Sequence, residues 1–134
     1  MGWKLVHHRD LGIIELILRG ELTQKDFIDA ASARVRAGKE TGVNRFIINP
    51  LELVATRTQA LDVVDIPSQV YERNHANPTS FVALLQAEGE EMRLLTRFYE
   101  TAALNRGWKI RVFEQREAAL TWLNGVQLTL PDQP

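Results

Sequence analysis

The sequence predicts a single α/β domain, in which about four helices cover a mixed β-sheet that is mostly parallel and begins with an antiparallel hairpin. Short apolar runs rich in β-branched residues alternate with segments whose apolar residues recur at helical spacing. A helix between two strands forms a crossover, so the later strands should run parallel. We place the domain at residues 1–126. Residues 127–134 should form a flexible tail, because they include two prolines and little to bury.

The N-terminal hairpin is predicted from two strand-like runs at residues 5–8 and 13–18, joined by turn residues at 9–12. In the second run, the residues at even positions from Ile14 to Leu18 are all apolar and share one face of the strand. We therefore expect this face to be buried and the opposite face to be only partly covered.

The first helix is predicted to begin at a capping box, in which Thr23 and Asp26 each satisfy a free backbone N–H of the other. Gly38 is expected to end it, since glycine tolerates the left-handed conformation common at helix ends. A buried strand should follow at 45–49 and stop at Pro50, which cannot donate to a sheet ladder.

The second half of the chain repeats the alternation of helix and strand. The expected elements are a helix over 56–74 interrupted at Pro67, a strand over 80–85, a helix from the acidic loop at 88–91 to Gly107, a strand over 109–113 and a short helix over 116–124. This order supports the crossovers that a parallel sheet requires.

Composition argues against several classes of function. Sixteen basic against seventeen acidic residues leave no excess charge for binding nucleic acid. The chain has no cysteine, which excludes thiol catalysis, disulfides and zinc–thiolate sites. We find no glycine-rich phosphate loop and no nucleophile elbow, so the chain is predicted not to be an enzyme and to use no cofactor.

Histidines and acidic residues also offer no strong site. His7 and His8 are neighbours on a strand and point to opposite faces, and His75 is the only other histidine, so no metal site is expected. The glutamates at 88–91 are explained by the dipole of the helix that they begin. Trp3 lies on the predicted edge strand, where another chain could add, and a homodimer through that edge or a helix face is left open.

The C-terminal part carries a family resemblance. Its residues are the run Phe98–Gly107, the strand Ile110–Phe113 and the helix segment Glu117–Leu123, together with Gly20–Thr23 before the first helix. With the order of elements over residues 3–124, they resemble the SpoIIAA-like or STAS-like small bacterial proteins, named for their similarity to anti-sigma-factor antagonists. The resemblance implies a non-enzymatic regulatory module.

The same resemblance raises the question of a phosphorylation switch. Family members that are switched in this way carry a serine shortly after an Asp-x pair that follows a central strand. The corresponding stretch Asn49–Leu53 has neither residue. Thr56 and Thr58 follow it, and for both a helix-capping role is favoured over phosphorylation.

Ligands in α/β folds usually bind where the carboxyl ends of parallel strands meet helix N-termini. This places the candidate ligand or partner site on two loops. Its residues are Asn49, Thr56, Arg57, Thr58, Gln86 and Glu88. Arg57 would assist an anion at the first loop, whereas acidic residues oppose an anion at the second.

Two functions remain open. The first is a cytoplasmic binding module for a protein partner or a small ligand, with no transmembrane segment. The alternative is a carrier of a small molecule or lipid, with an apolar pocket under the helix region around Pro67. A carrier predicts a sizeable apolar cavity, and an interaction module predicts an exposed apolar patch.

Overall fold

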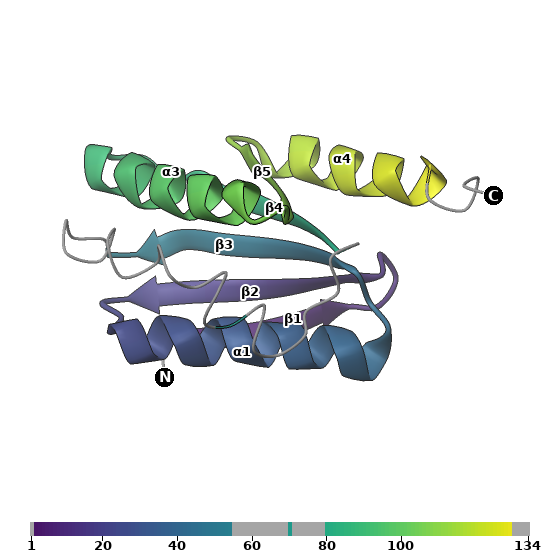
Figure 1. Ribbon diagram of the computed structural model, residues 1–134, viewed down its shortest axis with the longest axis horizontal. Helices are drawn as coiled ribbons and strands as arrows, with labels where there is room; N and C mark the ends of the chain where they lie inside the picture. The colour runs from purple at the N-terminus through teal and green to yellow at the C-terminus, as the bar shows by residue number, and fades with distance from the viewer. Residues whose placement is uncertain (1, 55–69, 71–79, 130–134) are drawn as a thin grey trace.

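The computed structural model describes residues 2–54, 70 and 80–129, with side chains described up to residue 125. Five strands form one sheet in the order β1-β2-β3-β4-β5 (Figure 1). They are β1 (Trp3–His8), β2 (Ile13–Gly20), β3 (Arg45–Leu53), β4 (Phe81–Leu85) and β5 (Lys109–Phe113). The β1–β2 pair is antiparallel and the other three pairs are parallel, which confirms the predicted α/β class and its N-terminal hairpin.

Three described helices cover the sheet on both faces (Figure 1). Helices α1 (Gln24–Thr41) and α3 (Glu90–Asn105) pack on one face, and α4 (Arg116–Thr129) packs on the other against β4 and β5. The helix predicted over 56–74 lies outside the described residues, apart from Val70, which is fully buried in the core cluster that includes residues of α1 and α3.

Strand β2 confirms the predicted division between a buried and a partly covered face. The apolar residues at even positions from Ile14 to Leu18 join the core under α1 and α3. On the opposite face, Ile13 packs with α4 residues, whereas Ile17 is only partly buried. Glu15 lies between them and is buried despite its charge.

Helix α1 begins as predicted and ends later than predicted. Both hydrogen bonds of the Thr23–Asp26 capping box are present. The predicted end at Gly38 is wrong: Gly42 ends the helix, with a left-handed φ of 77°. Gly38 has a packing role instead, because a Cβ there would lie 2.6 Å from Cζ of Phe46. Its missing side chain lets α1 approach β3 closely.

Strand β3 passes through Pro50, so the predicted stop at this residue is wrong. The pairing with β2 shifts register here: Ile17 faces Asn49, but Arg19 faces Glu52. The irregularity leaves an extra residue on β3, and a proline is tolerated there because the regular ladder is already interrupted. The paired region with β4 ends earlier, at Ile48.

Helix α4 continues beyond the predicted end at Asn124. It passes through Gly125 and reaches Thr129, into the first residues of the segment expected to be flexible. Ala119 and Leu123 are fully buried against the sheet, in agreement with their helical spacing. Packing of this face against β4 and β5 outweighs the weak helix propensity of one glycine.

Candidate functional site

The predicted site at the carboxyl edge of the sheet is divided between its two faces. Asn49 points to the α4 face, where it contacts Glu15. Gln86 lies on the other face, where its amide donates to the Ala87 carbonyl at 2.8 Å and lies 3.4 Å from Oγ1 of Thr96 on α3. Glu88 is exposed. The structure therefore does not bring these three side chains together, and residues 56–58 lie outside the described part of the chain.

Asn49 instead belongs to a polar cluster centred on Glu15. The Glu15 carboxylate accepts two hydrogen bonds from Arg116, at 2.6 and 3.0 Å, and one from the Asn49 amide at 2.9 Å. His8 Nε2 lies 2.8 Å from the same carboxylate. The cluster joins β1, β2 and β3 to the first residue of α4, and the side-chain carbonyl of Asn49 also accepts from the backbone N–H of Leu51.

Electrostatics keep Glu15 ionised. Burial by itself would raise the pKa of this carboxyl group, since the side chain is only 4% exposed. The hydrogen bonds from Arg116, Asn49 and His8 more than offset burial and lower the pKa from 4.5 to about 2. The carboxylate in turn raises the pKa of Arg116. A group held ionised in this way is a poor proton donor or acceptor near neutral pH, so the cluster serves as an anchor for α4.

Sequence reasoning missed this cluster, although one signal was present. Glu15 is the only charged residue in the apolar run 13–18, which indicates a buried partner. Its strongest partner, Arg116, is 101 residues away in sequence. No local pattern connects the two.

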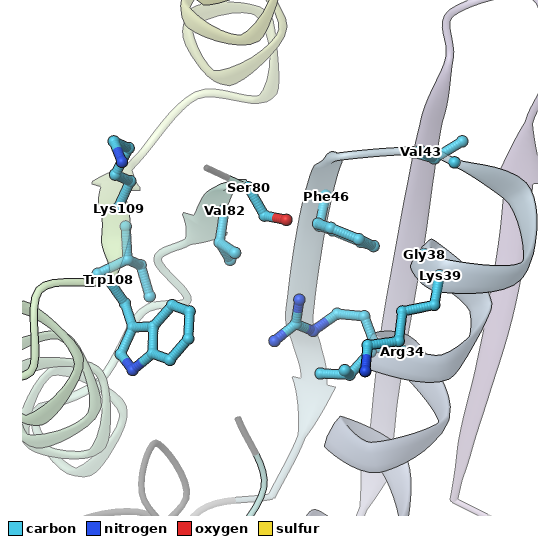
Figure 2. Close-up of a pocket in the computed structure, with 12 residues that line it drawn as sticks. Arg34, Gly38, Lys39, Val43, Phe46, Ser80, Val82, Trp108 and Lys109 are labelled. Atoms are coloured by element: carbon cyan, nitrogen blue, oxygen red, sulfur yellow. The ribbon is translucent and has the colours of Figure 1, made fainter. Parts of the chain in front are cut away.

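A second candidate site is a cavity of about 230 Å³ between α1 and the amino ends of β3, β4 and β5 (Figure 2). The described residues that line it come from α1, from the loop that follows it and from the starts of the three strands. They are Arg34, Val35, Gly38, Lys39, Gly42, Val43, Phe46, Ser80, Val82, Trp108, Lys109 and Ile110. This is the edge of the sheet opposite to the one predicted.

The cavity combines an apolar wall with a buried cation. Arg34 is 3% exposed, and its guanidinium carbon lies 4.9 Å from the centre of the Phe46 ring. Figure 2 shows the Arg34 side chain reaching from α1 into the space, with Trp108 across from it. Lys39 lines the side formed by α1. The ammonium group of Lys109 does not enter the cavity. Its side chain points away from the cavity and places Nζ 5.8 Å from the centre of the Phe81 ring.

The sequence positions these groups through helical spacing. Residues 34, 35, 38 and 42 are separated by one, three or four positions, and they lie along one side of α1 and its cap. Gly38 has no side chain, so this side of α1 lies close to the Phe46 ring. The charged residues among the described lining are Arg34, Lys39 and Lys109.

A smaller apolar cavity of about 50 Å³ lies farther along the same face, between α1 and α3. Arg34 borders both cavities. Within residues 2–54 and 80–125 no group of three histidine or acidic side chains is placed to hold a metal ion. None of the described helices is long and apolar enough to cross a membrane.

Comparison with known proteins gives no assignment. No protein-family model matches this chain, and no curated protein is significantly similar to it. The site must therefore be interpreted from its own geometry.

Proposed function

We propose that this protein is a STAS-like, non-enzymatic regulatory module of the cytoplasm, and that it binds a small ligand in the cavity between α1 and the amino ends of β3–β5. The observation that carries the proposal is the position of Arg34, a buried cation directed into a cavity with otherwise mostly apolar walls. Small-molecule sites typically have this composition, in which apolar surface supplies affinity and a few polar groups fix orientation.

The Glu15 cluster and the cavity beside α1 support different roles, one in stability and one in binding. The carboxylate of Glu15 has its hydrogen-bonding capacity taken up by Arg116, Asn49 and His8. Such a cluster stabilises the fold and leaves little capacity for a ligand. The cavity, in contrast, has a volume of about 230 Å³ and a largely apolar lining.

A fragment screen followed by amide NMR shifts tests the proposal. We expect binders to shift the amides of Val43, Val82 and Ile110, which line the cavity. Ser80→Phe should fill part of the cavity and weaken binding. Glu40→Phe, at an exposed position of the same region that does not line it, is the matched control. Shifts confined to other surfaces, or equal binding by both variants, would contradict the proposal.

A protein partner is a second candidate, favoured by one observation. Leu51 and Val54, at the carboxyl end of β3, are 54% and 52% exposed. The ion pair between Arg19 and Glu52 lies beside them. An exposed apolar pair with a charged rim is typical of a contact surface. Leu51→Ser with Val54→Ser should then abolish capture of a partner from the native cell without changing the fragment shifts.

The lipid-carrier alternative has less support. Its expected pocket under Pro67 lies outside the described residues. The apolar cavity between α1 and α3 measures about 50 Å³, far below the roughly 300–1,000 Å³ typical of ligand pockets. Native mass spectrometry of the purified protein tests this alternative directly, because a carrier should retain bound lipid.

A further inference from the structure

Ser80 brings to the cavity beside α1 a hydroxyl group that forms no hydrogen bond with any described residue. We infer, on the basis of the function proposed above, that the ligand is an uncharged molecule of one aromatic ring with a single hydrogen-bonding group, either a hydroxyl or a carbonyl. The Ser80 hydroxyl would bond to this group, and the ring would lie against Trp108.

The charged residues of the lining are already engaged within the protein. The Arg34 guanidinium stacks over the Phe46 ring, with its carbon 4.9 Å from the ring centre, and makes a further interaction besides. Lys39 also has an interaction of its own. The side chain of Lys109 points away from the cavity, toward the Phe81 ring. Because a charge that leaves water must be paired, an ionised ligand would lose its hydration here without gaining a free counter-charge.

The Ser80 hydroxyl supplies the hydrogen bond. Ser80 immediately precedes β4 and is partly buried. Figure 2 shows its oxygen pointing from the start of β4 toward Phe46, across the cavity. A serine hydroxyl can both donate and accept, so it can bond to a hydroxyl or to a carbonyl group of a ligand. It would give up no bond to a described residue in doing so.

The remaining walls and the volume suit a single ring. Val43, Val82 and Ile110 contribute apolar surface. Trp108 lies across the cavity from Arg34 and offers an aromatic ring for an offset-stacked or edge-to-face contact. A cavity of roughly 150 Å³ is sufficient to bind benzene. The cavity of about 230 Å³ would therefore hold one ring with a small substituent, and a long acyl chain would not fit within it.

Phenol and toluene isolate the hydrogen bond, because they have the same ring and substituents of similar size. Each is titrated into the full chain, as wild type and as Ser80→Ala, while amide NMR shifts are recorded. We expect the ratio of phenol affinity to toluene affinity to be about three- to tenfold lower in Ser80→Ala, which corresponds to the loss of one neutral hydrogen bond. Comparing the two ratios cancels the different hydrophobicity of the probes and any general effect of the variant on the cavity.

Two further variants and two charged probes complete the test. Ser80→Thr keeps the hydroxyl and should retain at least part of the wild-type ratio. Ser32→Ala makes the same change as Ser80→Ala at a position of α1 that does not line the cavity, so the ratio should stay unchanged. Benzoate and benzylammonium carry opposite charges on the same ring. Both should bind to the wild-type chain more weakly than phenol, because neither finds a free counter-charge.

The outcomes distinguish this ligand class from the function on which it rests. An equal ratio in wild type and Ser80→Ala would overturn the hydrogen bond from Ser80. Tighter binding of benzoate or benzylammonium than of phenol would overturn the uncharged ligand. Either result leaves the proposed function standing. If neither these probes nor a wider fragment set shifts the amides of the cavity residues, both the ligand class and the proposed function fail.

Discussion

Arg116, the first residue of α4, holds the buried carboxylate of Glu15 on β2 through two hydrogen bonds of 2.6 and 3.0 Å. This contact fixes the start of α4 on the face of the sheet opposite to α1 and α3. It joins residues that are 101 positions apart in sequence and connects the N-terminal hairpin to the last helix. The energetic role of the contact can be measured.

Arg116→Met should destabilise the protein by about 3 kcal/mol, because it leaves the Glu15 charge buried with only His8 and Asn49 as partners. Adding Glu15→Leu should recover at least about half of that loss, since an apolar pair needs no compensation. Urea denaturation of both variants measures the difference.

The exposed pair of Lys25 and Asp29 provides a control for this prediction. Its side chains are 82% and 45% exposed, so Lys25→Met should change the free energy of unfolding far less than Arg116→Met does. A similar small effect for Arg116→Met would contradict the anchoring role of Arg116.

Glu15 should also make the stability of the protein depend on pH. The pKa of its carboxyl group is about 2 in the folded protein, against the ordinary glutamate value of 4.5 expected for the unfolded chain. A folded-state pKa below the unfolded value stabilises the protein above about pH 4.5, and this contribution is lost as the pH falls toward 2. The lost contribution is about 3 kcal/mol.

Glu15→Gln isolates this effect from that of the other acidic groups. The difference in unfolding free energy between wild type and variant should be largest near neutral pH and should shrink as the pH falls from about 4.5 to 2. Chemical denaturation at a series of pH values gives this difference. A constant difference over that range would mean that the Glu15 pKa is not lowered in the folded protein.

Gly38→Ala should destabilise the protein by about 2 kcal/mol. Its Cβ would meet Phe46 Cζ at 2.6 Å and the Val43 carbonyl oxygen at 3.1 Å, so either α1 or β3 must shift. Gly125→Ala is the matched helical control, since nothing lies within 4 Å of its added Cβ. That control should be neutral or stabilising by up to about 1 kcal/mol, by helix propensity. Thermal unfolding compares the two variants, and equal effects would refute the close packing at Gly38.

Gly42→Ala tests the end of α1. The backbone φ of 77° costs about 1–2 kcal/mol for a residue with a Cβ, although no atom lies within 4 Å of the added carbon. Gly42→Asn should cost less than Gly42→Ala, because asparagine tolerates the left-handed conformation. If both variants are as stable as wild type, the helix does not end in this conformation.

Much of the fold was predictable because its signals are local. The Thr23–Asp26 capping box and the alternation along β2 involve residues close in sequence, and the structure confirms both. The roles of Gly38 and Pro50 were not predictable in this way. The first depends on contact with Phe46, and the second on a register shift against β2. Both are properties of tertiary pairing.

The candidate site was harder to predict than the fold. Asn49 and Gln86 are expected together from sequence because each lies near the carboxyl end of a strand. The pairing of Ile48 with Leu84 shows why they are separated: it places Asn49 beside Leu85, so Gln86 belongs to the opposite face. A shift of one residue in an unknown register moves a side chain across the sheet. Predicting the cavity would require knowing how α1 packs on the sheet, because its walls come from α1 and three strands.

The position of a bound probe tests the central claim most directly. Intermolecular NOEs between a fragment that binds and a sample with labelled Val, Ile and Leu methyl groups report which side chains surround the fragment. The account predicts NOEs to Val82 and Ile110, with NOEs to the indole ring of Trp108 in the same sample. NOEs confined to Leu51 and Val54, or to no part of the cavity, would contradict it.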